Sequence, residues 1–365
     1  MLFRRHASFA LLSLLASCWL SSGSFAQDAA PAVAHETEPA LTRVLFGSCV
    51  KQDQPVPIFD AILARQPELF LFLGDNIYAD TTDMELMRSK YAKLGADAGF
   101  QRLLKACPVM ATWDDHDYGG NDAGADFPLR EQSQQVFLDF WGDPADSPRR
   151  QREGVYEAKV FGPAGKRVQV IMLDVRYFRG PLKTGPRRLG GPYVPEENPA
   201  VTMLGAEQWA WLEEQLRVPA EVRLIASGIQ CVSQDAGHET WSNLPHERQR
   251  LFDLIAKTGA SGVLLLSGDR HWAELSVERQ GVPYPLYDLT SSSLNQLHPR
   301  GTPTDNRTRA IAKTYHRENF GEIIIDWTTS DPQLQLRVLD LAGEPVLETA
   351  LGLSELRPTP TAGEN

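Results

Sequence analysis

Six short apolar runs, each followed directly by polar residues, constrain the fold of this chain most strongly. Their length and their content of branched and large apolar residues are typical of buried strands. The runs lie at 43–47, 69–73, 109–113, 168–173, 222–226 and 263–266. Patterns with helical periodicity separate them, at about 56–66, 81–105, 129–141, 204–217 and 245–258. This alternation predicts an α/β layered fold.

The pattern changes after residue 320. Two strand-like runs, 322–327 and 333–340, follow each other with no helical pattern between them. Their proximity predicts an antiparallel hairpin that closes the fold. Two segments rich in Pro, Gly and basic residues, 176–200 and 298–310, are predicted to be long loops, either functional or simply solvated.

The first 26 residues have the features of an export signal. Arg4 and Arg5 precede an apolar run, and small residues at 24 and 26 suit a cleavage site. The run is too short for a helix that spans a bilayer of about 30 Å. Two refinements stay open, a lipid anchor at Cys18 and the twin-arginine rather than the Sec route. Each predicts an exported protein, either periplasmic or secreted.

The remaining chain is predicted to form one domain. Residues 27–40 are predicted to be a linker, 41–354 the folded domain and 355–365 a flexible tail. Of the 365 residues, 42% are hydrophobic and 23% are charged, which are globular proportions. The net charge of −11 argues against sequence-specific nucleic-acid binding. No later segment is long and apolar enough for a transmembrane helix, and four cysteines are too few for a disulfide-dense scaffold.

Polar residues gather where the six runs end. In open α/β sheets, ligands bind outside the carboxyl ends of the strands. We therefore expect the following side chains to share one crevice: Cys49, Asp75, Asp115, Arg176, Gln230, Asp269 and His271.

Part of this set supplies soft or strongly basic donors. A thiolate from Cys49 and an imidazole from His271 suit a transition metal. Tyr78 lies three residues after Asp75 and can turn back into the crevice. A phenolate is a good ligand for Fe³⁺. These residues predict a softer half of the crevice.

The other donors are oxygen atoms only. Asp115, Asp269 and Gln230 suit Ca²⁺, Mn²⁺ or Mg²⁺. The carboxylate of Asp75 can bridge this harder half and the softer half. Two metals that share a ligand can hold a phosphate group and supply a hydroxide nucleophile.

Taken singly, each residue also fits a structural role. Cys49 can pack as a small apolar residue, and Tyr78 can serve packing. Asp75 and Asp269 follow glycine, where aspartate often forms turns. Gln230 is the weakest ligand candidate, and Arg176 suits a surface ion pair equally well. Their joint occurrence at successive strand ends favours a shared site.

Five motifs resemble those of the PhoD-like (alkaline phosphatase D) branch of the calcineurin-like metallophosphoesterases. They are FGSC (46–49), GDNIYAD (74–80), WDDHDYGGND (113–122), LDVRYFR (173–179) and SGDRHWAEL (267–275). The likeness runs from 43 to about 351, so 41–354 is predicted to be a PhoD-like metallophosphatase domain. It implies a four-layer αββα sandwich of two mixed sheets flanked by helices.

The resemblance also implies a ligand set. Fe³⁺ would be held by Cys49, Asp75, Tyr78 and His271. A hard cation, Ca²⁺ or alternatively Mn²⁺ or Mg²⁺, would be held by Asp75, Asp115 and Asp269, with Gln230 or Asn121 as a further ligand.

The chain departs from the wider superfamily at several motif positions, and the departures match the PhoD-like variant. Cys49 stands where the first Asp would be, Asp115-His116 replaces Asn-His, and Asp269 with His271 replaces the final His pair. Only a short linker precedes the first predicted strand, so we expect the extra N-terminal domain of larger family members to be absent.

The residues suggest roles in catalysis as well. His116 stands beside a predicted ligand and can hydrogen-bond the phosphate or protonate the leaving group. Arg176, with Arg179, can bind phosphate oxygens in a bidentate manner. Asp75, His116 and Arg176 are the predicted catalytic residues. His116, Asn121 and Arg176 are the predicted substrate contacts.

The predicted function is an exported metal-dependent phosphoesterase that acts on small phosphodiesters, phosphomonoesters or both. Two alternatives stay open: a phospholipase-like activity on membrane lipids, and a non-catalytic exported protein that binds phosphate or metal. A serine hydrolase is disfavoured because the chain has no G-x-S-x-G motif. Nucleotide-dependent classes are disfavoured because neither G-x-G-x-x-G nor a Walker A pattern occurs.

Overall fold

The computed structural model describes residues 39–188, 191–298 and 305–358. The chain divides into two units, 1–31 and 32–365, and the described residues all belong to the second unit. The predicted export signal with Cys18, most of the predicted linker and the end of the predicted tail lie outside the described residues.

One mixed sheet of six strands has the order β14-β13-β12-β1-β2-β3. β1, β2 and β3 are parallel, and β12, β13 and β14 continue the sheet in antiparallel fashion. The predicted hairpin is confirmed as β12–β13, and β14 extends it. The strands span Arg43–Gly47 (β1), Leu69–Leu73 (β2), Val109–Thr112 (β3), Asn319–Asp326 (β12), Gln333–Asp340 (β13) and Pro345–Gly352 (β14).

A second six-stranded sheet has the order β10-β11-β9-β8-β5-β4. Its four inner strands are parallel, and the two edge strands pair in antiparallel fashion. The strands span Glu157–Phe161 (β4), Val168–Met172 (β5), Val222–Ser227 (β8), Val263–Ser267 (β9), Ala273–Glu278 (β10) and Leu286–Ser291 (β11). Every residue of β8 and β9 is buried, as expected for strands covered on both faces.

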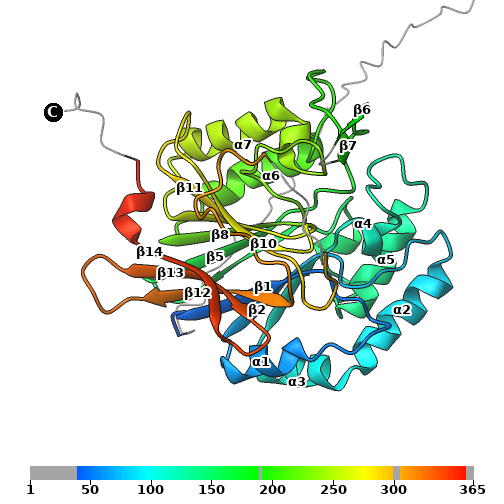
Figure 1. The fold of residues 1–365 in the computed structure, drawn as a ribbon, viewed down its shortest axis with the longest axis horizontal. Coiled ribbons are helices and arrows are strands. Elements are labelled where there is room, and N and C mark those ends of the chain that lie inside the picture. Colours follow the sequence, from blue (N-terminus) through cyan, green and yellow to red (C-terminus); the bar gives the residue numbers. More distant parts are fainter. Residues whose placement is uncertain (1–38, 189–190, 299–304, 359–365) are drawn as a thin grey trace, which may run out of the picture. The chain divides into compact units, whose positions relative to one another are not determined.

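Alternation along β2 shows how the layers stack. Leu69, Leu71 and Leu73 pack into a core that also contains strands of the second sheet. Phe70 and Phe72 point the opposite way, into a core shared with helices. The chain therefore forms two mixed sheets flanked by helices, as the resemblance implied (Figure 1). The helices are α1 (Ile58–Ala64), α2 (Met84–Ala96), α3 (Ala98–Ala106), α4 (Asp115–Tyr118), α5 (Arg130–Phe140), α6 (Gly205–Arg217) and α7 (Pro245–Thr258).

The structure refines several predicted boundaries. The helical pattern at 81–105 forms two helices, because Asp97 is extended and its side chain accepts from the backbone N–H of Phe100 at 2.9 Å. The predicted loop at 176–200 contains a two-stranded ribbon, β6 (Thr184–Arg188) with β7 (Gly191–Tyr193). Short 3₁₀ turns span Pro148–Arg150, Trp241–Asn243 and Leu353–Leu356. The last of these buries Leu356, so the packed chain runs past the predicted start of the tail.

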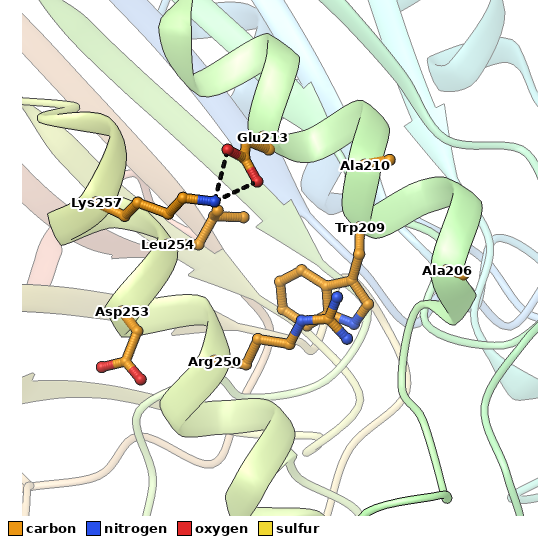
Figure 2. A pocket seen from close by; sticks show the side chains of 8 residues that line it. All are labelled: Ala206, Trp209, Ala210, Glu213, Arg250, Asp253, Leu254 and Lys257. Atoms are coloured by element: carbon orange, nitrogen blue, oxygen red, sulfur yellow. Dashed lines mark hydrogen bonds and ion pairs between the residues drawn. The ribbon is translucent and has the colours of Figure 1, made fainter.

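Helices α6 and α7 pack beside each other and form a groove of 420 Å³ (Figure 2). Three of its charged residues have partners within the groove: Lys257 Nζ lies 2.8 Å from Glu213 Oε1, and Arg250 stacks on Trp209. Among all the described residues, α6 and α7 included, no helix combines the length and the apolar character needed to cross a bilayer.

Candidate metal centre

The polar residues that follow β1, β2, β3 and β9 meet at one edge of the sandwich. The backbone there is strained: among the described residues, seven non-glycine residues have positive φ, and six of them lie in this region. They are Cys49, Asp75, Asp80, Asp122, Asp269 and His271. Such conformations cost about 1–3 kcal/mol each and persist where the surrounding structure holds them. The concentration of strain marks this edge as a functional site.

Two glycines let the loops approach closely. Gly74 has φ +99°, and a Cβ there would lie 2.4 Å from Cβ of Asp114. A Cβ on Gly268 would lie 2.6 Å from Oγ of Ser48, on the other sheet. Gly74 therefore lets the loops after β2 and β3 approach each other within one sheet, and Gly268 lets a loop of the second sheet approach the first.

The predicted softer ligands come together as expected. Donor atoms of Cys49, Asp75 and His271 all lie within 4.8 Å of one another. The hydroxyl of Tyr78 is 3.1 Å from Oδ2 of Asp75 and 2.8 Å from Nε2 of His271. Cys49 Sγ is 3.5 Å from the same Asp75 oxygen. Four side chains from three separate motifs thus surround one point.

The predicted harder ligands form an adjoining cluster. Asp114, Asp115 and Asp269 form one group within 4.8 Å, and Asp75, Asp115 and His116 form another. The carboxylate of Asp115 also accepts from backbone N–H groups, at 3.0 Å from His116 and 2.7 Å from Asp122. Asp75 belongs to both the softer and the harder group, which is the arrangement a bridging carboxylate requires.

The electrostatics of the cluster fit a cation site. Burial raises the pKa of Asp75 well above its usual value, and Asp115, Asp117 and Asp269 raise it further. Burial likewise raises the pKa of Asp269 to about 7. Asp115 differs: burial opposes its ionisation, yet Arg176 and His116 lower its pKa to about 2. Buried carboxylates this close repel one another, and bound cations would relieve that repulsion. The donor set therefore fits two metal ions.

The two weaker predicted ligands stand apart. Gln230 is buried and its NH₂ group donates to Glu274 at 2.5 Å and to Thr290 at 2.9 Å, which leaves its carbonyl oxygen for another partner. Asn121 is exposed and lines a pocket of 160 Å³ beside the cluster, together with His116, Asp269 and His271. Across the described ranges, neither side chain hydrogen-bonds to the clustered carboxylates.

Arg176 is buried beside the predicted harder ligands. It is 0% exposed, and its guanidinium pairs with Asp114 at 2.5 Å and with Glu239 at 2.6 Å. Arg179 also pairs with Glu239, at 3.1 Å. These ion pairs engage both arginines with buried carboxylates, and they tie Arg176 to the loop that carries Asp115. The predicted contact of Arg176 with phosphate stays a prediction.

His116 lines the same pocket, and two contacts fix its ring. Its Nδ1 lies 2.6 Å from Oδ1 of Asp80, and its ring packs against Tyr78 with centroids 4.3 Å apart. Burial lowers its pKa, but the bond to Asp80 and the nearby Asp115 outweigh burial and raise the pKa to about 9. The contact with Asp80 engages Nδ1, so Nε2 remains as the second polar atom of the ring.

Several residues of the site were not predicted. Asp80, Asp117 and Asp122 lie inside the motifs GDNIYAD and WDDHDYGGND, so the sequence held a signal that could have identified them. Asp117 accepts from the backbone N–H groups of Asp75, Asn76 and Asp114, so it fixes the loop that follows β2. Residues of the pocket wall carry no such signal, because they come from segments with no recognisable motif: Tyr193, His238 and Glu239.

Comparisons with known proteins agree with this geometry. A family model described as PhoD-like phosphatase matches residues 44–328. Alkaline phosphatase D of Bacillus subtilis (strain 168) is 24% identical over 279 residues, which is 62% of this chain and 46% of that protein. A solved structure of PhoD has a TM-score of 0.68 at 17% identity and covers 90% of this chain and 72% of that one. A dimetal phosphatase from Danio rerio has a TM-score of 0.47 at 12% identity, over 86% of this chain and 99% of that one.

These comparisons cover different parts of the proteins and support different conclusions. The PhoD structure shares the fold of this chain. The chain spans about half the length of the curated relative that it matches. The family match covers the strands and loops that build the clustered donors, from β1 to the end of β12.

Proposed function

Because the chain belongs to the PhoD-like phosphatases, we propose that it is a metal-dependent phosphoesterase whose active centre is the donor cluster around Asp75. The observation that carries this proposal is the pair of overlapping buried clusters that share Asp75. Such an arrangement suits two cations that hold one phosphate group between them. The proposed domain is 41–354, and the proposed substrates are small phosphodiesters or phosphomonoesters.

The proposed metals follow from the donor types. Cys49, Asp75, Tyr78 and His271 would hold Fe³⁺, and Asp75, Asp115 and Asp269 would hold Ca²⁺, Mn²⁺ or Mg²⁺. When bound, the two cations would acidify water and neutralise charge on the phosphate. Gln230 remains a proposed further ligand through its carbonyl oxygen.

The chain's own residues would supply the proton and the orientation. His116, held by Asp80, would donate a proton through Nε2 to the leaving oxygen or hydrogen-bond a phosphate oxygen. Asn121 would contact the substrate at the mouth of the pocket. Arg176 would act indirectly, since its pairing with Asp114 holds the loop of Asp115 in place.

The proposed function is tested with the purified protein and two model substrates, p-nitrophenyl phosphate and bis-p-nitrophenyl phosphate. We expect hydrolysis of at least one of them, its loss with chelators, and its recovery when metals are returned. Tight binding of phosphate or metal without turnover would support the alternative of a non-catalytic binding protein. Hydrolysis that resists complete metal removal would contradict the metal centre.

The proposed iron site has a spectroscopic signature. Tyr78→Phe should remove a visible charge-transfer band of the metal-loaded protein, because only the phenolate oxygen is lost from beside Asp75 and His271. Absorption spectra and metal analysis of the wild type and the variant check this. Tyr91→Phe is a matched control, since its hydroxyl bonds Asp117 behind the centre. A colourless, iron-free and fully active wild type would rule out the iron assignment.

Export is proposed from residues 1–26 alone, through the Sec or the twin-arginine route, with Cys18 as a possible lipid site. A lipid-anchored enzyme would meet membrane phosphodiesters. Parallel assays on phosphatidylcholine vesicles and on soluble diesters distinguish a phospholipase-like activity from the proposed one.

A further inference from the structure

A pocket of 160 Å³ opens beside the donor cluster. Asp269 and His271 of the cluster line it together with Tyr193, His238 and Trp272. The volume corresponds to roughly five water molecules. A ligand group in this pocket would therefore lie next to a phosphate held at the cluster.

Donors without acceptors concentrate in this pocket. Within the part of the chain that the structure describes, Arg270 Nε, Trp272 Nε1 and His238 Nε2 are buried atoms with no hydrogen-bond partner. Arg270 is 6% exposed and Trp272 is 2% exposed. A buried donor that lacks an acceptor loses its hydration without compensation. Two such donors, Arg270 Nε and Trp272 Nε1, on one pocket with Nε2 of His238 indicate a ligand that accepts hydrogen bonds.

Arg270 is the cationic side chain of this corner, on a pocket whose lining also includes Asp122, Glu239 and Asp269. The guanidinium of Arg270 stacks 4.4 Å from the ring centroid of Trp272, and its NH1 lies 3.6 Å from Oδ2 of Asp269. Asp269 is itself grouped with Asp114 and Asp115, so a cation held there would weaken its hold on Arg270. Burial lowers the pKa of His238 to about 4, and the nearby Arg270 lowers it further. The attraction for an anion in this corner would therefore come from Arg270 and not from His238.

The groove between α6 and α7 provides an internal comparison (Figure 2). Arg250 stacks on Trp209 at 4.5 Å, nearly the same distance as in the first Arg–Trp pair. There the indole N–H donates to Glu247 at 2.8 Å, and Arg250 also pairs with Glu247 at 3.3 Å. A single carboxylate satisfies both donors of that stack. At the pocket, Asp269 lies 3.6 Å from NH1 of Arg270, but among the described residues no carboxylate accepts from the indole N–H of Trp272 or from Nε of Arg270.

From these contacts we propose that Arg270, Trp272 and His238 form a subsite for a second phosphate group of the substrate. This inference rests on the proposed function, since the first phosphate would sit at the metal cluster. It narrows the substrate class to compounds that carry a second phosphate close to the one that is cleaved, such as phosphoanhydrides and compact bisphosphates. A planar guanidinium, an indole N–H and an imidazole would bind its oxygens.

The test compares two non-hydrolysable probes, methylphosphonate and methylenediphosphonate, by calorimetry on the metal-loaded protein. We expect the wild type to bind the diphosphonate at least about tenfold more tightly, and Arg270→Gln to reduce that ratio to about threefold or less. Trp272→Phe keeps the stacking surface and removes only the N–H, so it should lower the ratio less. Arg250→Gln is the matched control and should leave the ratio unchanged.

The ratio of the two affinities distinguishes the subsite from metal chelation and from a contact with the first phosphate. Chelation of metal by the diphosphonate would strengthen its binding equally in every variant, and would overturn the proposal. A fall in affinity for both probes alike in Arg270→Gln and Trp272→Phe would place these residues at the first phosphate, and would overturn it as well. Metal analysis of each variant accompanies the measurement because Arg270 contacts Asp269. If the protein shows the expected ratios but hydrolyses no ester, the result supports the subsite and contradicts the proposed function.

Discussion

Replacing Asp75 by Asn should lower the rate of phosphate-ester hydrolysis by on the order of 10³-fold or more, because the bound cations supply several kcal/mol of transition-state stabilisation. Asp75 is the one side chain that both proposed metal groups share, and it is 1% exposed. An amide keeps the shape and removes the charge that would bridge two cations. Steady-state kinetics and metal analysis measure the two effects together.

The control for this substitution is Asp60→Asn, the same chemical change at an exposed acid on α1 that pairs with Arg102. It should leave both activity and metal content unchanged. Full activity and full metal content in Asp75→Asn would contradict the shared-ligand centre.

Although Asp75→Asn should lower activity, it should raise the stability of the metal-free protein. The pKa of Asp75 is raised in the folded protein, so folding favours its protonated form. This contribution is present at pH values below the usual carboxyl pKa and is lost as pH rises toward the raised value. At neutral pH the neutral amide should therefore raise the free energy of unfolding of the metal-free protein. Thermal melts at pH 7 and pH 4 check this, and the gain should vanish at pH 4.

The sequence predicted well those strands whose buried positions are all apolar. The limits of β1, β2 and β13 agree with the predicted runs: β2 is apolar throughout, and in β13 the buried residues Leu334, Leu336 and Val338 alternate with polar ones. β10 and β11 were not predicted, since they carry buried polar residues such as Glu274 and Asp288. Those side chains are satisfied by partners far along the chain: Gln230 donates to Glu274, and backbone N–H groups of 231 and 232 donate to Asp288. No local pattern encodes such pairing.

The same distinction between local patterns and long-range contacts applies to the candidate metal centre. The ligand candidates could be predicted because each lies directly after a strand within a short motif. The buried ion pairs of Arg176 could not, since one of them involves Glu239, which lies in a loop 63 positions later in the chain and is itself buried. Tyr193 similarly reaches Asp122 across 71 positions, at 2.5 Å. Contacts of this kind depend on how the loops pack over the sheets.

Substituting Arg176 by Met should destabilise the folded protein by about 3–5 kcal/mol, because Asp114 and Glu239 would be left buried without that cation. All three side chains are at most 2% exposed, so water cannot replace the guanidinium. Denaturant unfolding monitored by circular dichroism measures the loss. Arg88→Met, at an exposed i,i+3 pair with Glu85, is the control and should change stability by at most about 1 kcal/mol.

The pH dependence of this defect identifies its cause. Burial raises the pKa of Glu239 to about 8, although Arg176 and Arg179 both lower it. Without Arg176 that pKa should rise further, so folded Glu239 would bind a proton that the unfolded chain releases. Stability then falls as pH rises, and the defect of Arg176→Met should be larger at pH 9 than at pH 5. Adding Glu239→Gln should reduce both the defect and its pH dependence. A variant with unchanged stability and a raised KM would instead restore Arg176 as a direct phosphate ligand.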